Sequence, residues 1–288
     1  MAGNLTKRIG FAVVAIPAAV GLVWLGGLPL AILLALVGGL GARELFDIAA
    51  RRGITPARGP GIFGAAAVGP LVWAGLTLPG TGPLLQDAAP YLAAAFIVAV
   101  LLAVLRTTRP DAQPLASAAV TVFAVAYCAV LTSFLLVIRH RLHPEQSWPG
   151  AWLVFLPLVV IWVCDTAAMF GGKLIGGPKL APVVSPGKTR SGGVAGLAGA
   201  VVAALVFSQA ALVPTGVTLG VGQLVLFGLV LGVVGQAGDL VESLFKREAG
   251  VKVSSNLIPG HGGILDRFDS LYVTLPVAAG LNRLFGVL

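Results

Sequence analysis

The residues able to do chemistry are concentrated in two polar segments of an otherwise apolar sequence. The first runs from Asp165 to Ser191, DTAAMFGGKLIGGPKLAPVVSPGKTRS, and the second extends from Asp239 to Asp269. Only 10% of the 288 residues are charged, whereas 57% are hydrophobic. Because ionisable groups near a membrane are costly, such clusters indicate a functional site.

The second segment predicts two pairs of carboxylates. If a helix continues through GDLVESLFKR, then Asp239, Glu242 and Lys246 share one of its faces. Asp266 and Asp269 have the same helical spacing at the start of a further helix. Two such pairs would repel each other without a cation, and oxygen ligands beside phosphates are what Mg²⁺ prefers. We therefore expect a metal site.

A simpler interpretation is that these acids pair with Lys246, Arg247 and Arg267 at the membrane surface, where ion pairs contribute little. The presence of two carboxylate pairs around PGHGG favours the metal. His261 lies between glycines in that motif, and its role stays open among ligand contact, proton donation and a polar group satisfied by the backbone.

The first segment predicts a phosphate-binding loop. Asp165 falls inside an apolar run, where it either lines a polar cavity, which we favour, or forms a packing hydrogen bond. Glycines that permit close backbone approach and lysines that supply charge both suit phosphate. A loop that is basic only because it is cytoplasmic is the alternative. SPGKT does not complete a Walker A loop, because Pro182 replaces the first glycine and we expect no strand before it.

Composition predicts an all-α, polytopic membrane bundle, since the mean hydropathy is +0.97 and helices satisfy their own backbone in lipid. Nine spans are expected, at 9–25, 28–42, 61–79, 91–105, 115–138, 151–171, 193–213, 217–237 and 270–285. We interpret the first as a retained signal anchor. Cys128 and Cys164 fall within spans and suggest neither a disulfide framework nor a zinc site. Gly192 and Gly196, like Gly228 and Gly232, have the spacing of closely packed membrane helices.

Charge distribution predicts the orientation. With the N-terminus in the cytoplasm, all but three of the 19 basic residues lie inside, the exceptions being Arg139, Arg141 and Arg283. The net charge of +8 then follows from topology and implies no nucleic-acid partner, although it can attract anionic lipid. We divide the chain into N-terminal membrane helices, 1–114, and a catalytic part, 115–288, with cytoplasmic loops at 172–192 and 238–269.

The segment SLFKREAGVKVSSNLIPGHGGILDRFD resembles the signature of phosphatidate cytidylyltransferases, the CDP-diacylglycerol synthases. The matching positions are Ser243, Lys246, Arg247, Lys252, Ser255, Leu257, Pro259, His261, Gly262, Gly263, Asp266, Arg267 and Asp269. The stretches DTAAMFGGK, SPGKT and GDLVES also resemble the family. Val253 stands where the signature has aspartate, and Ser191 where many relatives have an acid.

The resemblance implies an enzyme of phospholipid biosynthesis that converts CTP and phosphatidate into CDP-diacylglycerol and pyrophosphate. The catalytic residues implied are Asp239, Asp266, Lys246, Arg247 and His261. Substrate contacts are expected from Ser185, Lys188, Thr189, Lys173, Lys179, Ser243, Arg267 and Lys252. Mg²⁺ is expected on Asp239, Asp266, Asp165, Glu242 and Asp269, and a second cation and a homodimer stay open.

The expected location is the inner cell membrane, with a multi-pass chain and the active site on the cytoplasmic side. An ion-coupled transporter or flippase is the main alternative, although the first five spans carry almost no internal charge and do not repeat the C-terminal pattern. A CTP-dependent lipid kinase is the other, and it would need a general base for an alcohol.

Overall fold

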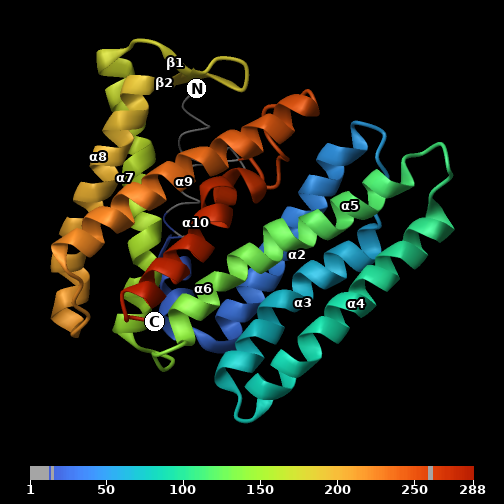
Figure 1. The fold of residues 1–288 in the computed structure, drawn as a ribbon, viewed down its shortest axis with the longest axis horizontal. Coiled ribbons are helices and arrows are strands. Elements are labelled where there is room, and N and C mark those ends of the chain that lie inside the picture. The colour runs from blue at the N-terminus through green and yellow to red at the C-terminus, as the bar shows by residue number, and fades with distance from the viewer. Residues whose placement is uncertain (1–12, 14–15, 259–261) are drawn as a thin grey trace.

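The structure is a computed structural model that describes all residues except 1–12, 14–15 and 259–261. Helices dominate and lie side by side as a bundle (Figure 1). The elements are α2 (Gly27–Ala50), α3 (Arg58–Thr77), α4 (Thr81–Thr107), α5 (Pro114–Val125), α6 (Leu131–His140), α7 (Trp148–Ile175), β1 (Lys179–Ala181), β2 (Ser185–Thr189), α8 (Arg190–Phe207), α9 (Val221–Glu248) and α10 (Leu265–Leu284). A short apolar helix, Ile16–Leu25, precedes α2.

Seven helices of the described chain are long and apolar enough to cross a membrane, whereas the sequence predicted nine spans. The α5 and α6 helices form one of the seven, because a π-helical turn at Ala126–Val130 joins them into a continuous segment, Pro114–His140. The first predicted span is described only in part, and its described part contains the short apolar helix Ile16–Leu25. The last predicted span corresponds to α10, which carries charged residues near both ends and packs into the core. The multi-pass helical architecture is confirmed.

The segment predicted as an irregular loop contains a β-hairpin. Strands β1 and β2 pair antiparallel, with Lys179 opposite Thr189 and Ala181 opposite Ser185. The expectation that no strand precedes SPGKT was therefore wrong: β1 precedes it, and SPGKT is itself β2. Pro182 lies in the connection between the strands, where a missing backbone N–H costs no ladder hydrogen bond.

Glycines allow α7, α8 and α9 to pack closely. A Cβ atom on Gly196 would lie 3.1 Å from the Ala168 Cβ of α7, and one on Gly228 would lie 2.6 Å from the Val201 Cα of α8. Backbones that approach this closely leave no room for larger side chains. The spacing noted in the sequence therefore forms two helix contacts, and these contacts fix the helices that carry the polar segments.

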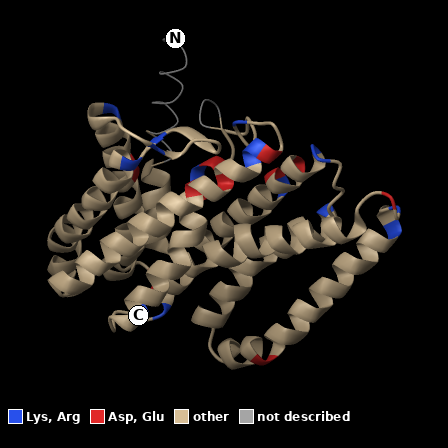
Figure 2. Cartoon of the chain, turned by 45° about the horizontal axis from the view of Figure 1, so that its top comes forward, with Lys and Arg blue, Asp and Glu red and all other residues tan. Residues whose placement is uncertain are grey.

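Charged residues are concentrated at one end of the bundle (Figure 2). The C-terminal end of α2, the hairpin, the C-terminal end of α9 and the N-terminal end of α10 all lie at this end, as Figure 1 shows. Hydrogen bonds link α2 to α10 and the hairpin to α9. The two polar segments of the sequence therefore come together at this polar end.

Candidate active site

A cavity of about 640 Å³ lies between the last turns of α7, the hairpin, the start of α8 and the middle of α9. Its polar lining contains most of the residues predicted in the first segment, together with Asp239 from the second. The polar residues of the lining are Asp165, Lys173, Lys179, Lys188, Thr189, Gln236 and Asp239, and glycines line it at 172, 176, 177, 187, 192 and 193. The cavity combines carboxylates, lysines and glycine backbone, which is the composition expected for a phosphate site.

The centre of this cavity is an ion pair between the hairpin and α9. Lys188 Nζ lies 2.5 Å from Asp239 Oδ2, and both side chains are about three-quarters buried. Ser243, one turn further along α9, donates to Asp239 Oδ1 at 3.3 Å. The pair therefore fixes the hairpin against α9 and places Lys188 in the wall of the cavity.

The base of the hairpin is held by the start of α8. Thr189 is the N-cap of that helix, and its hydroxyl accepts a hydrogen bond from the Gly192 backbone N–H at 3.1 Å. A Cβ atom on Gly172 would lie 2.8 Å from the Thr189 hydroxyl, so only glycine fits there. These contacts place Lys188 over the cavity, and Ser185 sits at the far end of the same strand, outside the cavity lining.

A second polar cluster surrounds Lys246 on α9. Its Nζ lies 2.7 Å from Asp266 Oδ1 and 3.2 Å from Glu242 Oε1. The other Asp266 oxygen accepts hydrogen bonds from the backbone N–H groups of Gly263 and Ser254, and it shares the single proton of the Ser254 hydroxyl with Glu44. Burial alone would raise the pKa of Asp266, but the hydrogen bonds from Gly263, Lys246 and Ser254 outweigh it and hold that pKa below its usual value.

Glu44 is a member of this cluster that the sequence reasoning did not place among the site residues. Its buried carboxylate accepts hydrogen bonds from the Ser254 and Ser255 hydroxyls and from the backbone N–H groups of Ile264 and Leu265. The available signal was an acidic residue at the end of a predicted span, but the sequence could not say which distant segment it contacts.

The carboxylates predicted to share one metal form ion pairs and hydrogen bonds with different partners. Among the described residues, no group of three or more His, Cys, Asp and Glu side chains is arranged to hold a metal ion. Asp165 and Asp239 line the cavity, whereas Glu242 and Asp266 surround Lys246. Asp269 accepts the N–H of its neighbour Ser270 at 2.6 Å.

The cavity nevertheless suits Mg²⁺. This ion is commonly bound by one or two carboxylates and completes its shell with water and substrate phosphates. Asp165 and Asp239 provide two carboxylates on a wall that also carries phosphate-binding groups. Asp266 does not line this cavity, and its carboxylate is held by Lys246, Gly263 and Ser254.

The remaining predicted residues lie around these two clusters. Arg247 donates to the carbonyl oxygens of Val184 and Val251, and so ties the hairpin connection to the end of α9. Lys252 and Arg267 are exposed. Val253, which replaces the signature aspartate, is 47% exposed and does not line the cavity. His261 lies outside the described residues.

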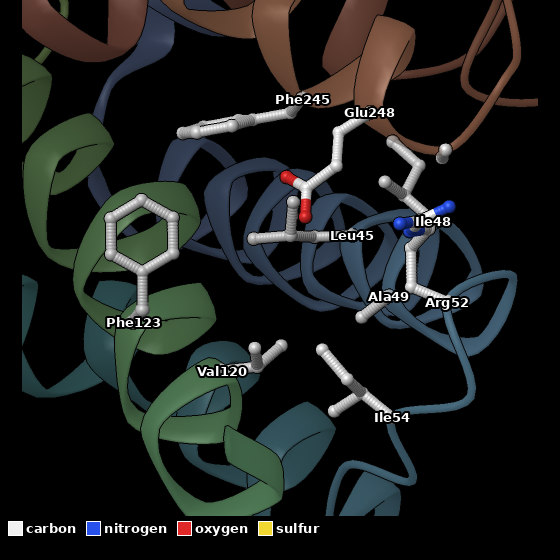
Figure 3. Close-up of a pocket in the computed structure, with 10 residues that line it drawn as sticks. Leu45, Ile48, Ala49, Arg52, Ile54, Val120, Phe123, Phe245 and Glu248 are labelled. Carbon is white, nitrogen blue, oxygen red and sulfur yellow. The ribbon is translucent and has the colours of Figure 1, made fainter.

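A smaller cavity of about 170 Å³ lies between α2, α5 and the end of α9 (Figure 3). Leu45, Ile48, Phe123 and Phe245 form much of its wall, and Arg52 and Glu248 are its charged members. It contains no residue predicted for catalysis, substrate contact or metal binding. Its apolar lining separates it chemically from the polar cavity.

Comparison with known proteins assigns the family. The model of the "Cytidylyltransferase family" matches residues 6–285. The "Phosphatidate cytidylyltransferase" of Brucella suis biovar 1 is 34% identical over 285 residues, which cover 99% of this chain and 94% of the relative. The enzymes of the same name from Bacillus subtilis and Haemophilus influenzae are 46% and 39% identical, over 47% and 49% of this chain and 49% of each relative. The chain that places these lysines and carboxylates around a polar cavity is therefore a member of the cytidylyltransferase family.

Proposed function

We propose that the chain is a phosphatidate cytidylyltransferase, which joins CTP and phosphatidate to give CDP-diacylglycerol and pyrophosphate. The family match over nearly the whole chain and the relatives of that name support this assignment. The structural observation that carries it is the cavity around Lys188 and Asp239, where a basic hairpin, glycine backbone and carboxylates meet. That combination is suited to a nucleoside triphosphate.

The reaction needs positioning more than activation of a nucleophile. An oxygen of the phosphatidate phosphate, already ionised near neutral pH, attacks the α-phosphorus of CTP. The bond from that phosphorus to the bridging oxygen breaks, and pyrophosphate leaves. Catalysis therefore consists of holding two anionic groups in line and neutralising their repulsion.

Lysines of the two clusters supply the positive charge in this proposal. Lys188 binds a phosphate of CTP when the nucleotide replaces Asp239 as the partner of its ammonium group. Lys173 and Lys179 line the same cavity. Lys246, oriented by Glu242 and Asp266, is assigned to the lipid phosphate. When bound, Mg²⁺ would be held by Asp165 and Asp239 and would offset the negative charge of the CTP phosphates.

We assign the polar end of the bundle to the cytoplasmic side. The Lys and Arg residues concentrated there in Figure 2 agree with the positive-inside distribution. CTP is dissolved in the cytosol, whereas phosphatidate is anchored in the bilayer. A site at the cytoplasmic end of a helical bundle is accessible to both substrates.

The test is to incubate purified protein with CTP, phosphatidate and Mg²⁺ and to identify the products by mass spectrometry. CDP-diacylglycerol and pyrophosphate are expected in equal amounts. Absence of both products under every divalent metal tried would overturn the proposal.

A further inference from the structure

Glu44 connects the N-terminal half of the chain to the loop that carries the signature. It lies on α2, and its residue is only 3% exposed. Its four hydrogen-bond donors come from both sides of the same loop. Ser254 and Ser255 precede residues 259–261, and Ile264 and Leu265 follow them. One buried carboxylate therefore holds both ends of this loop.

The contact also supplies a cap for α10. The first turn of a helix leaves its backbone N–H groups without partners, and the N-cap residue here, Ile264, has no side-chain acceptor. Glu44 Oε1 accepts the Ile264 N–H at 3.0 Å, and Oε2 accepts the Leu265 N–H at 2.9 Å. A carboxylate at a helix N-terminus is also favoured by the helix dipole. Glu44 therefore fixes the start of the helix that carries Asp266.

Ser254 transmits this constraint to Lys246. Its hydroxyl oxygen lies 2.8 Å from Glu44 Oε2 and 2.8 Å from Asp266 Oδ2. The other oxygen of Asp266 holds Lys246 Nζ at 2.7 Å. Moving Glu44 would thus release Ser254, alter the hydrogen bonds that Asp266 accepts, and change the position of the lysine.

We propose that Glu44 is a positioning residue for the transferase reaction: it holds the loop and the start of α10 so that Asp266 orients Lys246. The inference rests on the proposed function, because the assignment of Lys246 to the lipid phosphate comes from there. It gives the N-terminal helices a defined task in the reaction beyond anchoring the chain.

Glu44→Gln is the direct test, because it preserves size. Both carboxylate oxygens of Glu44 are hydrogen-bond acceptors, and each accepts one hydrogen bond from a serine hydroxyl and one from a backbone N–H. Whichever way the glutamine amide turns, its NH₂ group meets a backbone N–H that cannot reverse its role. Glu248→Gln is the matched control, since Glu248 lines the apolar cavity and stands outside the cluster.

Two measurements on the full-length protein decide the matter. We expect Glu44→Gln to lower kcat by about 10²-fold, the size of effect seen when reacting groups are misplaced, while KM for CTP changes less than about threefold. Hydrogen exchange at the amides of residues 254, 264 and 265 should rise by about tenfold or more, because hydrogen bonds to a charged acceptor are lost. Exchange along α7 and α8 should stay unchanged, and Glu248→Gln should match the wild type in both measurements.

A wild-type kcat for Glu44→Gln would overturn the inference, as would faster exchange spread throughout the bundle. If that variant does not fold, Ser255→Ala takes its place: it removes one donor of the four and should lower kcat by about threefold to tenfold. An unchanged kcat would then overturn the inference. If the wild-type chain makes no CDP-diacylglycerol, the proposed function fails, whereas the exchange data still decide whether Glu44 holds the loop.

Discussion

Lys188 and Asp239 form an ion pair that joins the β-hairpin to α9 across the polar cavity, with Nζ 2.5 Å from Oδ2. The two residues lie 51 positions apart in the sequence, with the whole of α8 between them. The close packing of α8 against its neighbours brings them together. The pair brings a candidate phosphate-binding lysine and a candidate metal ligand into one cavity.

Lys188→Met should weaken nucleotide binding. Loss of a charge-assisted hydrogen bond costs about 1.5–3 kcal/mol, so we expect KM for CTP to rise by about tenfold to 100-fold. Steady-state kinetics at saturating phosphatidate measure this change. Lys188→Arg, which keeps the charge, should recover part of the loss, and an unaltered KM in the methionine variant would remove Lys188 from the nucleotide site.

Asp239→Asn should lower kcat by a factor of about 10² to 10³, the range found when a preorganised electrostatic group is lost from an active site. The Mg²⁺ concentration for half-maximal activity should also increase, because one of the two cavity carboxylates is removed. Asp47→Asn is the control, since Asp47 pairs with Arg58 at a half-exposed site outside the cavity. Equal metal titration curves for Asp239→Asn and the wild type would argue against Mg²⁺ at this carboxylate.

Gly263→Ala should disrupt the cluster around Glu44. A Cβ atom there would clash with both the Glu44 Oε2 atom and the Ser254 hydroxyl oxygen, so these hydrogen-bonded side chains or the loop would have to shift. Overpacking of this kind costs about 1–3 kcal/mol, which thermal unfolding in detergent would detect as a lower Tm. The matched change Gly280→Ala, within helix α10 and with open space around the new methyl group, should leave Tm unchanged or raise it. A Gly263→Ala variant as stable as the wild type would show that the loop is not packed as described.

Val253→Asp restores the acid of the family signature, and we expect it to change activity by no more than about twofold. Val253 is 47% exposed and does not line the cavity, and exposed substitutions generally shift free energies by about 0.5 kcal/mol or less. Activity assayed across a Mg²⁺ titration measures the effect. A large gain in activity, or a lower metal requirement, would mean that position 253 belongs to the metal site.

Local patterns in the sequence predicted much of this arrangement. Helical spacing correctly continued α9 through Lys246 and placed Asp266 and Asp269 on one helix. Apolar run length correctly predicted a multi-pass helical protein. The span predicted at 270–285 stays a prediction, because α10 packs into the core and is not among the seven described helices apolar enough to cross a membrane.

Long-range contacts were not predictable in this way. Spacing placed Asp239 and Glu242 on one face, yet Asp239 pairs with Lys188 while Glu242 pairs with Lys246. A pairing pattern of this kind depends on which helices are neighbours. The same limit applies to Glu44, whose four donors lie more than 200 residues further along the chain.

The most direct measurement of the central claim is the fate of the CTP phosphates. Purified protein is incubated with phosphatidate, Mg²⁺ and CTP labelled at either the α or the γ phosphorus, and lipid is extracted. We predict that the α label enters the lipid phase and that the γ label appears in water-soluble pyrophosphate. Transfer of the γ label to lipid would indicate a kinase, and retention of both labels in CTP would exclude the transferase; either result would contradict cytidylyl transfer.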